Sequence, residues 1–404
     1  LAEALADQGV DVTVLTSQVS GKEHFKKEGN VNVIREIKTG EHPGKFTSNL
    51  YRYILFGKNA KKLVAAYTKT LRPHLVHYFN TTSIQGKPIL DIPQIIHVNS
   101  PVLFCPKGTL MYKDQEECTV QCTYPSFVDC FRNSHELGRM RIKNWMRYNP
   151  LFLSYLHRSY KKRLGIAKGF DFYIAASEFM RNRLVKEGIQ EKKIISVPNI
   201  IEINEFKKAE PRKDKKDDNA DGKNVREKKI LYLGLLSRNK GLFVLLESLR
   251  NIKEPYHCSI YGDGPLKQEA KEYIKKHNLK AQVKGWANKA EIPQIIADHE
   301  VVVFPSLIPE GFGRVVVEAM AAGKAVIVSD AGALPELVDH EQDGLVVPSN
   351  NAQALGQAIE RLIKDDDLTR KFFTNSPEKA QIYEKKAIAR VVMEAYESLA
   401  GSQP

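Results

Sequence analysis

Residues 305–324 read PSLIPEGFGRVVVEAMAAGK and follow the apolar run 301–304. The apolar run predicts a buried parallel strand, and the prolines and glycines that come next predict a turn. The stretch 314–322 predicts a helix that stops at Gly323. A strand, a Gly-rich turn and a helix in this order direct free backbone N–H groups beyond the strand end. Such an arrangement suits an anion such as a diphosphate.

Two carboxylates frame this turn, because Glu310 precedes it and Glu318 lies inside the predicted helix. Eight helical residues span about 12 Å at roughly 1.5 Å each, so the two acids cannot form one tight pair. Their spacing allows them to hold the two ends of a nucleotide diphosphate-sugar. The alternative is an ordinary strand–helix turn with a solvated glutamate on the helix.

The same motif resembles the signature of retaining GT-B glycosyltransferases of family four. The resemblance rests on Glu310, Glu318 and the Gly311-Phe312-Gly313 run between them. It implies transfer of a sugar from a nucleotide diphosphate-sugar with retained anomeric configuration. It further implies that Glu310 contacts the donor sugar and Glu318 the ribose hydroxyls. The turn amides would then lie close to the sugar and the diphosphate.

The fold class follows from length and pattern. A chain of 404 residues is long enough for two ordinary domains. Strands alternate with helices in both halves, which predicts α/β domains with parallel sheets. We therefore expect two facing Rossmann-like domains with a ligand cleft between their strand ends, the GT-B architecture.

The expected domain boundaries rest on composition and on the resemblance. Residues 1–206 form an acceptor-side domain, and the charged segment 207–229 is too poor in apolar residues to bury a core, so it is a linker. Residues 230–376 form the donor domain. The resemblance implies that 377–404 hold a helix that crosses back to the first domain. It also implies a first strand and Gly-rich loop before residue 1, so we expect a truncated N-terminus.

Net charge is concentrated in one half of the chain. Residues 1–200 hold 30 Lys and Arg against 17 Asp and Glu, whereas residues 201–404 hold 31 of each. The first half should therefore meet an anionic partner, such as acidic lipid or a lipid-linked phosphate. Alternatively, the charge reflects a generally basic proteome. No motif supports nucleic-acid binding.

The stretch 139–164 interleaves basic and aromatic residues and is broken at Pro150. It predicts a helix pair at a membrane surface or facing the acceptor. The alternative is a pair of amphipathic helices packed on the sheet. No apolar run approaches the ~20 residues of a membrane span, and no secretory signal is visible. We therefore expect a cytoplasmic protein that is peripheral at the inner face of a membrane.

Four cysteines fall within a predicted insertion, residues 105–130: Cys105, Cys118, Cys122 and Cys130. Their spacing is not that of a C-x-x-C zinc motif, and disulfides are unusual without a secretory signal. A structural zinc or iron–sulfur site, disulfides and unpaired thiols all remain open. The insertion follows the loop after His97, so we expect it to line one side of the acceptor site.

His97 ends the predicted strand 92–98, where polar residues of parallel sheets often serve function. The resemblance places a histidine near the transferred sugar, and a neutral imidazole there can hydrogen-bond a sugar hydroxyl. A purely structural histidine is the alternative. His77 ends the preceding strand and is a weaker candidate.

Cations for the donor phosphates are expected in the turn 237–241, after the predicted strand 230–236. Lys240 matches the lysine of the family. The position of the family's arginine holds Leu235, and Arg238 is the candidate replacement, since a guanidinium pairs well with phosphate. Helix-start surface charge is the alternative for both.

Two further candidates follow the next strands. Gly262 permits a tight turn after the strand 258–261. In the family, the backbone around Trp286 lies along the nucleotide base, so Trp286 is a candidate for the base pocket. The alternative is a tryptophan packed at a domain edge.

These residues together predict a retaining glycosyltransferase that acts on an acceptor hydroxyl of a glycan or lipid-linked molecule. The predicted catalytic residues are His97, Glu310 and Lys240. No convincing Asp-x-Asp stands at a strand end, so Lys240, Arg238 and amides should stabilise the leaving diphosphate and no cofactor is required. No carboxylate is placed as a nucleophile on the far face of the sugar, which favours a front-face reaction.

Other functions fit the same architecture. A phosphorylase or an epimerase is disfavoured by the spacing of Glu310 and Glu318. A non-catalytic protein that binds sugar nucleotides or anionic glycans is favoured slightly by Leu235.

Overall fold

The computed structural model describes residues 1–18, 21–38, 46–79, 83–134, 144–212 and 227–400. The chain divides into two compact units. Unit 1 comprises Leu1–Lys113, Thr119–Ile200 and Lys385–Pro404, and unit 2 comprises Asp114–Cys118 and Ile201–Glu384. Most of the predicted linker, residues 213–226, lies outside the described residues.

Unit 1 combines two sheets with helices. Its strands are β1 (Val12–Ser17), β2 (Phe25–Glu28), β3 (Val31–Ile37), β4 (Val76–Phe79), β5 (Gln94–Val98), β6 (Met111–Tyr112), β8 (Phe172–Ala175) and β9 (Ile194–Ser196). Its α-helices are α1 (Ala2–Ala6), α2 (Phe46–Leu71), α3 (Tyr124–Arg132), α4 (Pro150–Ala167), α5 (Glu178–Lys186) and α14 (Lys385–Ala400). Short 3-10 turns are η1 (Ser83–Gly86), η2 (Pro101–Leu103), η3 (Asn144–Arg147) and η4 (Glu191–Lys193).

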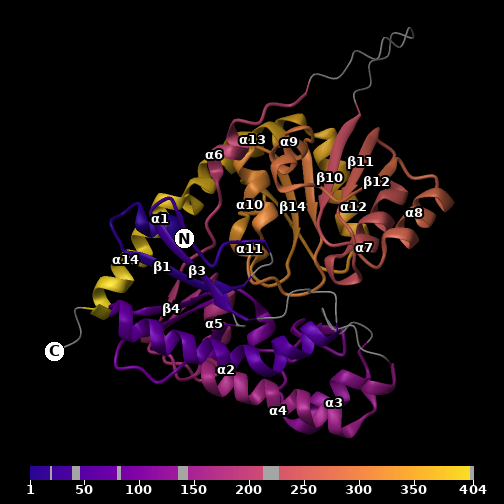
Figure 1. Ribbon diagram of the computed structural model, residues 1–404. Coiled ribbons are helices and arrows are strands. Elements are labelled where there is room, and N and C mark those ends of the chain that lie inside the picture. Colours follow the sequence, from indigo (N-terminus) through magenta and orange to yellow (C-terminus); the bar gives the residue numbers. More distant parts are fainter. Residues whose placement is uncertain (19–20, 39–45, 80–82, 135–143, 213–226, 401–404) are drawn as a thin grey trace. The chain divides into compact units, whose positions relative to one another are not determined.

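The four-stranded sheet of unit 1 has the order β4-β5-β8-β9 and is parallel throughout. Every residue of β5 and β8 is buried, as expected for parallel strands covered on both faces. Helix α14 covers part of this sheet, because Ile388 and Val392 pack with Ile95 and Ile174. Figure 1 shows α14, from the end of the chain, beside α1. The last helix therefore completes the core of unit 1.

The second sheet of unit 1 departs from the prediction of parallel strands. Its order is β1-β3-β2, and β2 is antiparallel to β3. Glu28 pairs with Val31, so Gly29 and Asn30 form a two-residue hairpin loop, with Gly29 at φ +59°. Gly-Asn loops favour such tight hairpins because glycine tolerates positive φ.

Unit 2 is an α/β domain whose main sheet is parallel. Its strands are β7 (Glu116–Glu117), β10 (Lys228–Leu233), β11 (Tyr256–Tyr261), β12 (Ala281–Gly285), β13 (Val301–Phe304), β14 (Ala325–Ser329) and β15 (Gly344–Val347). Its α-helices are α6 (Ile203–Lys207), α7 (Leu242–Ser248), α8 (Lys267–Lys276), α9 (Ile292–Ala297), α10 (Arg314–Ala321), α11 (Leu334–Leu337), α12 (Ala352–Lys364) and α13 (Asp366–Ala380). Its 3-10 turns are η5 (Arg238–Lys240), η6 (Leu249–Asn251), η7 (Lys289–Glu291) and η8 (Gln381–Tyr383).

The main sheet of unit 2 has the order β12-β11-β10-β13-β14-β15, with all neighbours parallel. The chain builds outward from β10 to β12, then returns to the other side of β10 and builds outward again from β13. The strand order therefore reverses between β10 and β13. Ligands of open parallel sheets bind beyond the carboxyl ends of the strands at such a switch point.

Candidate functional site

The loops at the switch point of unit 2 hold most of the residues that the sequence singled out. The turn after β10 carries Arg238 and Lys240, and the loop after β13 carries Glu310. Both loops leave the carboxyl ends of neighbouring parallel strands. Residues that lie 70 positions apart in the chain are therefore brought to one edge of the sheet.

A glycine locks these two loops together. Gly241 has φ +69°, and a Cβ built on it would lie 1.7 Å from the carbonyl oxygen of Pro305. The amide of Leu307 also donates to the carbonyl oxygen of Asn239 at 2.9 Å. Only a residue without a side chain permits this approach. The glycine at position 241 therefore allows the turn that carries Lys240 to lie against the β13 loop.

Lys240 and Glu310 form a direct ion pair. The Nζ of Lys240 lies 2.5 Å from Oε1 of Glu310, and the hydroxyl of Ser306 donates to the same oxygen at 2.6 Å. The side chains of Lys240 and Glu310 are 26% and 15% exposed. The ammonium also lies 5.8 Å from the centre of the Phe304 ring. A cation and a carboxylate are therefore adjacent and largely shielded from water. Their charges act more strongly on a ligand there than they would in bulk water.

The backbone of Glu310 is held by the loop after β14. The amide of Ala333 donates to the carbonyl oxygen of Glu310 at 2.9 Å, and Glu310 forms an isolated bridge with Gly332. Gly332 has φ +65°, and a Cβ there would lie 2.5 Å from both the nitrogen and the oxygen of Glu310. The carboxylate therefore projects from a backbone that is fixed on both sides.

Glu318 lies on helix α10, which begins directly after the Gly311-Phe312-Gly313 turn. Its side chain is largely buried, and its carboxylate lies 3.4 Å from the guanidinium of Arg314. Burial raises the pKa of Glu318, and Arg314 opposes this shift. A buried carboxylate of this kind accepts hydrogen bonds from hydroxyl groups in a setting where water competes poorly.

The remaining predicted donor residues differ in their surroundings. Phe312 is buried against Tyr383, with ring centres 5.7 Å apart. Gly262 donates to the carbonyl oxygen of Gly285 at 2.7 Å, and a Cβ on Gly262 would lie 1.8 Å from the oxygen of Gly234. Gly262 thus ties together the ends of β10, β11 and β12.

Arg238 and Trp286 are both open to solvent. The side chain of Arg238 is exposed and makes no hydrogen bond or ion pair within the described part of the chain. Trp286 is 77% exposed, so it is not part of the core of unit 2. Both side chains are accessible to a ligand.

Unit 1 holds the two predicted histidines on neighbouring strands. His97 of β5 is 2% exposed and packs on Phe79, with ring centres 4.6 Å apart. His77 of β4 lies parallel to it, with centres 5.8 Å apart. Neither ring nitrogen of His97 has a hydrogen-bond partner among the described residues. Burial, helped by His77, lowers the pKa of His97 to about 3, so its imidazole is neutral.

His77 has a partner that the sequence did not suggest. Its Nδ1 lies 2.5 Å from the hydroxyl of Tyr396 on α14. Burial lowers the pKa of His77 to about 4. The last helix of the chain therefore takes part in the polar cluster at the end of β4 and β5.

None of the four clustered cysteines forms a disulfide within the described residues, so the disulfide alternative is not realised. Within the described ranges no group of three or more His, Cys, Asp or Glu side chains could hold a metal ion. The zinc or iron–sulfur site stays a prediction.

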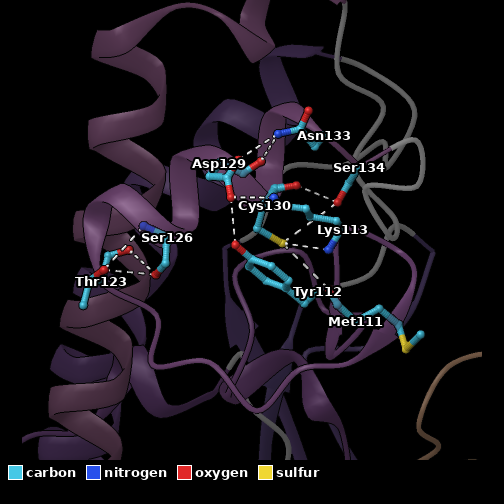
Figure 2. A network of polar contacts seen from close by, with 9 residues as sticks. All are labelled: Met111, Tyr112, Lys113, Thr123, Ser126, Asp129, Cys130, Asn133 and Ser134. Atoms are coloured by element: carbon cyan, nitrogen blue, oxygen red, sulfur yellow. Dashed lines mark hydrogen bonds and ion pairs between the residues drawn. The ribbon is translucent and has the colours of Figure 1, made fainter.

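Figure 2 shows the network that surrounds one of these thiols, Cys130. Its sulfur accepts from the amide of Lys113 at 3.4 Å and lies 3.8 Å from the oxygen of Met111. Asp129 beside it accepts from the hydroxyl of Tyr112 at 2.7 Å and pairs with the Lys113 ammonium at 2.8 Å. These contacts attach residues 111–113 to helix α3.

Two α/β units with parallel sheets define the class as a GT-B glycosyltransferase fold, and solved structures agree. Sucrose-phosphate synthase from Thermosynechococcus elongatus matches with a TM-score of 0.72 and 19% identity, covering 100% of this chain and 92% of that one. Anabaena HepE in complex with UDP-glucose matches with a TM-score of 0.63 and 18% identity, covering 96% and 99%. The predicted fold class is thereby confirmed.

The chain belongs to Glycosyltransferase Family 4, whose family model matches residues 1–205. The model of glycosyl transferases group 1 matches residues 213–379. The phosphatidyl-myo-inositol mannosyltransferase of Mycobacterium leprae is 30% identical over 182 residues, which are 43% of this chain and 48% of the relative. The chain spans less than half the length of the curated relatives that it matches.

Proposed function

We propose that this protein is a retaining glycosyltransferase that moves a sugar from a nucleotide diphosphate-sugar to an acceptor hydroxyl. The contact between Lys240 and Glu310 carries the proposal. This contact supports the proposal because it joins the cation that we assign to the diphosphate with the carboxylate that we assign to the sugar, at the carboxyl edge of a parallel sheet. The match to HepE in complex with UDP-glucose supports a nucleotide-sugar donor.

Each donor group has a proposed partner in unit 2, which we take as the donor domain. Glu318 accepts from the ribose hydroxyls, and Lys240 binds the diphosphate. The exposed Arg238 supplies a second cation from the same turn, and the amides of 311–313 approach the sugar. The solvent-exposed ring of Trp286 lies beside the base.

The proposed chemistry takes place on one face of the sugar. The bond between the anomeric carbon and the phosphate oxygen breaks, and the acceptor oxygen forms its bond on the same face. The acceptor proton passes to the leaving phosphate oxygen. Lys240 stabilises the charge that develops on this oxygen, which lets the reaction proceed without a metal. A hydrogen bond from the neutral His97 to a hydroxyl of the sugar stays a prediction of the family resemblance, because both ring nitrogens are buried in unit 1.

We also propose that the acceptor is a glycan or lipid-linked molecule at the inner face of an anionic membrane. The Mycobacterium leprae relative is a phosphatidyl-myo-inositol mannosyltransferase, which is named for a lipid acceptor. Four large side chains of η3, α4 and the link between them are exposed: Trp145, Tyr148, Leu151 and Tyr155, with Leu151 80% exposed. Arg158, in the next turn of α4, adds positive charge. Aromatic and basic side chains together favour the interface of an anionic membrane. No helix in the described part of the chain is long and apolar enough to cross a membrane.

A donor screen tests the proposed function. Calorimetry with UDP, ADP and GDP and their glucose conjugates identifies the preferred donor, and release of the nucleotide diphosphate then reports turnover. We expect Glu310→Ala to lower turnover to a small residual rate while nucleotide binding persists. Donor binding without hydrolysis or transfer would favour the second candidate, a non-catalytic sugar-nucleotide binding protein. That candidate is supported by Leu235, which is exposed where the family carries an arginine.

A further inference from the structure

Ser306 follows β13 and is sealed from solvent, with 1% of its surface exposed. Its hydroxyl lies 2.6 Å from Oε1 of Glu310, 3.1 Å from the oxygen of Ile308 and 3.3 Å from that of Asn239. A hydroxyl has only one proton to donate. The carboxylate oxygen is both the nearest acceptor and the one that carries charge, so it takes this proton.

Ser306 is itself fixed by a neighbouring strand. The hydroxyl of Ser329, at the end of β14, donates to the carbonyl oxygen of Ser306 at 2.6 Å, and Ser329 is also buried. A chain of hydrogen bonds therefore runs from Ser329 through Ser306 to Glu310. Because both serines are buried, water does not compete for these bonds, and the orientation of Ser306 is set by the sheet.

The two oxygens of Glu310 are treated differently. Oε1 accepts from Ser306 and pairs with Lys240, whereas Oε2 has no hydrogen-bond partner among the residues that the structure describes. The side chain of Glu310 is 15% exposed, and Oε2 is the oxygen that the described residues leave unbonded. One oxygen anchors the carboxylate, and the other is left to accept from a substrate hydroxyl.

The two donors to Oε1 differ in how a ligand would affect them. The ammonium of Lys240 is a charge on a flexible stem, and an incoming diphosphate attracts it. The hydroxyl of Ser306 is neutral and buried, so a ligand cannot draw it away. Resting on the proposed function, we propose that Ser306 is a positioning residue. It keeps the carboxylate of Glu310 aimed at the donor sugar when Lys240 turns to the diphosphate.

Ser306→Ala tests this proposal. We expect kcat to fall roughly ten- to a hundredfold, as for one lost hydrogen bond to a charged group. The KM for the donor and the calorimetric Kd of the free nucleotide diphosphate should stay within about twofold, because Ser306 does not touch the nucleotide. Ser306→Thr keeps the hydroxyl and should recover most of the rate.

The control variant is Ser248→Ala, which removes a similarly buried hydroxyl of unit 2. Its Oγ donates to the carbonyl oxygen of Leu245 at 2.7 Å and has no link to Glu310. It should shift the melting temperature about as much as Ser306→Ala does, with unchanged kcat. A matching fall in kcat for both variants would show that Ser306→Ala acts through general stability, which would overturn the proposal.

A double-mutant cycle adds a readout that does not depend on rescue. In a Glu310→Ala background, Ser306→Ala should have no further effect on the residual rate, because its target is gone. An independent further loss, or an unchanged kcat in Ser306→Ala alone, would overturn the positioning role while the glycosyltransferase proposal stands. A wild-type protein that neither binds nor turns over any nucleotide sugar would overturn both.

Discussion

Replacing Lys240 by Met removes the ammonium while keeping most of the side-chain volume, and we expect it to weaken diphosphate binding. The Nζ of Lys240 lies 2.5 Å from Oε1 of Glu310, and the Lys240 side chain is 26% exposed to solvent. A charged contact with a phosphate is worth about 1.5–3 kcal/mol, and 1.4 kcal/mol corresponds to a tenfold change in Kd. The Kd of the preferred nucleotide diphosphate should therefore rise roughly ten- to a hundredfold.

The stability cost of the same change should be smaller. Breaking a fully buried ion pair costs several kcal/mol, and an exposed pair contributes at most about 1 kcal/mol. Lys240 and Glu310 are each partly exposed, and Ser306 still donates to Glu310 after the change. We therefore expect the free energy of unfolding to fall by about 1–2 kcal/mol, measured by urea denaturation.

Lys228→Met is the matched control, because Lys228 begins β10, the strand that precedes the Lys240 turn, and pairs with Asp366 at 2.7 Å. It removes an ion pair at the opposite end of that strand and should leave nucleotide affinity unchanged. Calorimetry at two salt concentrations separates the variants, since the loss in Lys240→Met should shrink as salt rises. An unchanged Kd for Lys240→Met at low salt would refute the role of Lys240 as the diphosphate cation.

Three further predictions concern other parts of the chain. Glu318→Ala should weaken nucleotide binding about tenfold or more, because the ribose hydroxyls lose a charged acceptor; unchanged affinity in calorimetry would remove Glu318 from the site. The pKa of His97 is lowered to about 3. Its neutral imidazole therefore contributes its full stabilisation above the unfolded pKa near 6.5. The free energy of unfolding falls as the pH drops toward 3, by at most about 2 kcal/mol at pH 5. His97→Gln should therefore flatten the fall in melting temperature between pH 7 and 5, and an unchanged slope would contradict this. The double variant Trp145→Ser, Leu151→Ser should bind anionic vesicles several-fold less at low salt than the wild type. Val185→Ser, a control at another exposed apolar residue of unit 1, should bind like the wild type. Equal co-sedimentation of the wild type and both variants would argue against a membrane surface at η3 and α4.

Local sequence was sufficient to predict the class of fold, because each element carries its own pattern. The apolar run 301–304, the glycines after it and the helix formers that follow appear in the structure as β13, a turn and α10. The antiparallel pairing of β2 was missed although Gly29 and Asn30 mark a tight hairpin loop. That signal is local and was available in the sequence.

The contacts within the candidate site depend on strand order, which local patterns do not contain. Lys240 and Glu310 meet because β10 and β13 are neighbours at the point where the sheet changes direction. Without that order, the turn after β10 could equally have faced another loop. The same reason hides the contact between His77 and Tyr396, which joins a strand to a helix 319 residues later.

Ser306 illustrates an intermediate case between local pattern and strand order. A polar residue two positions after an apolar strand, at the carboxyl edge of a parallel sheet, is a recognisable candidate for function. Its burial and its partners, however, follow from packing. The carbonyl oxygen of Asn239, in the β10 turn, lies 3.3 Å from the Ser306 hydroxyl, and Ser329 of β14 donates to the Ser306 carbonyl oxygen. The neighbouring loops thereby convert an ordinary turn serine into a buried hydrogen-bond donor. If Ser306→Ala lowers kcat as we expect, the chemistry of the site depends on a residue that does not touch the ligand as well as on the glutamate and lysine that we expect to bind it.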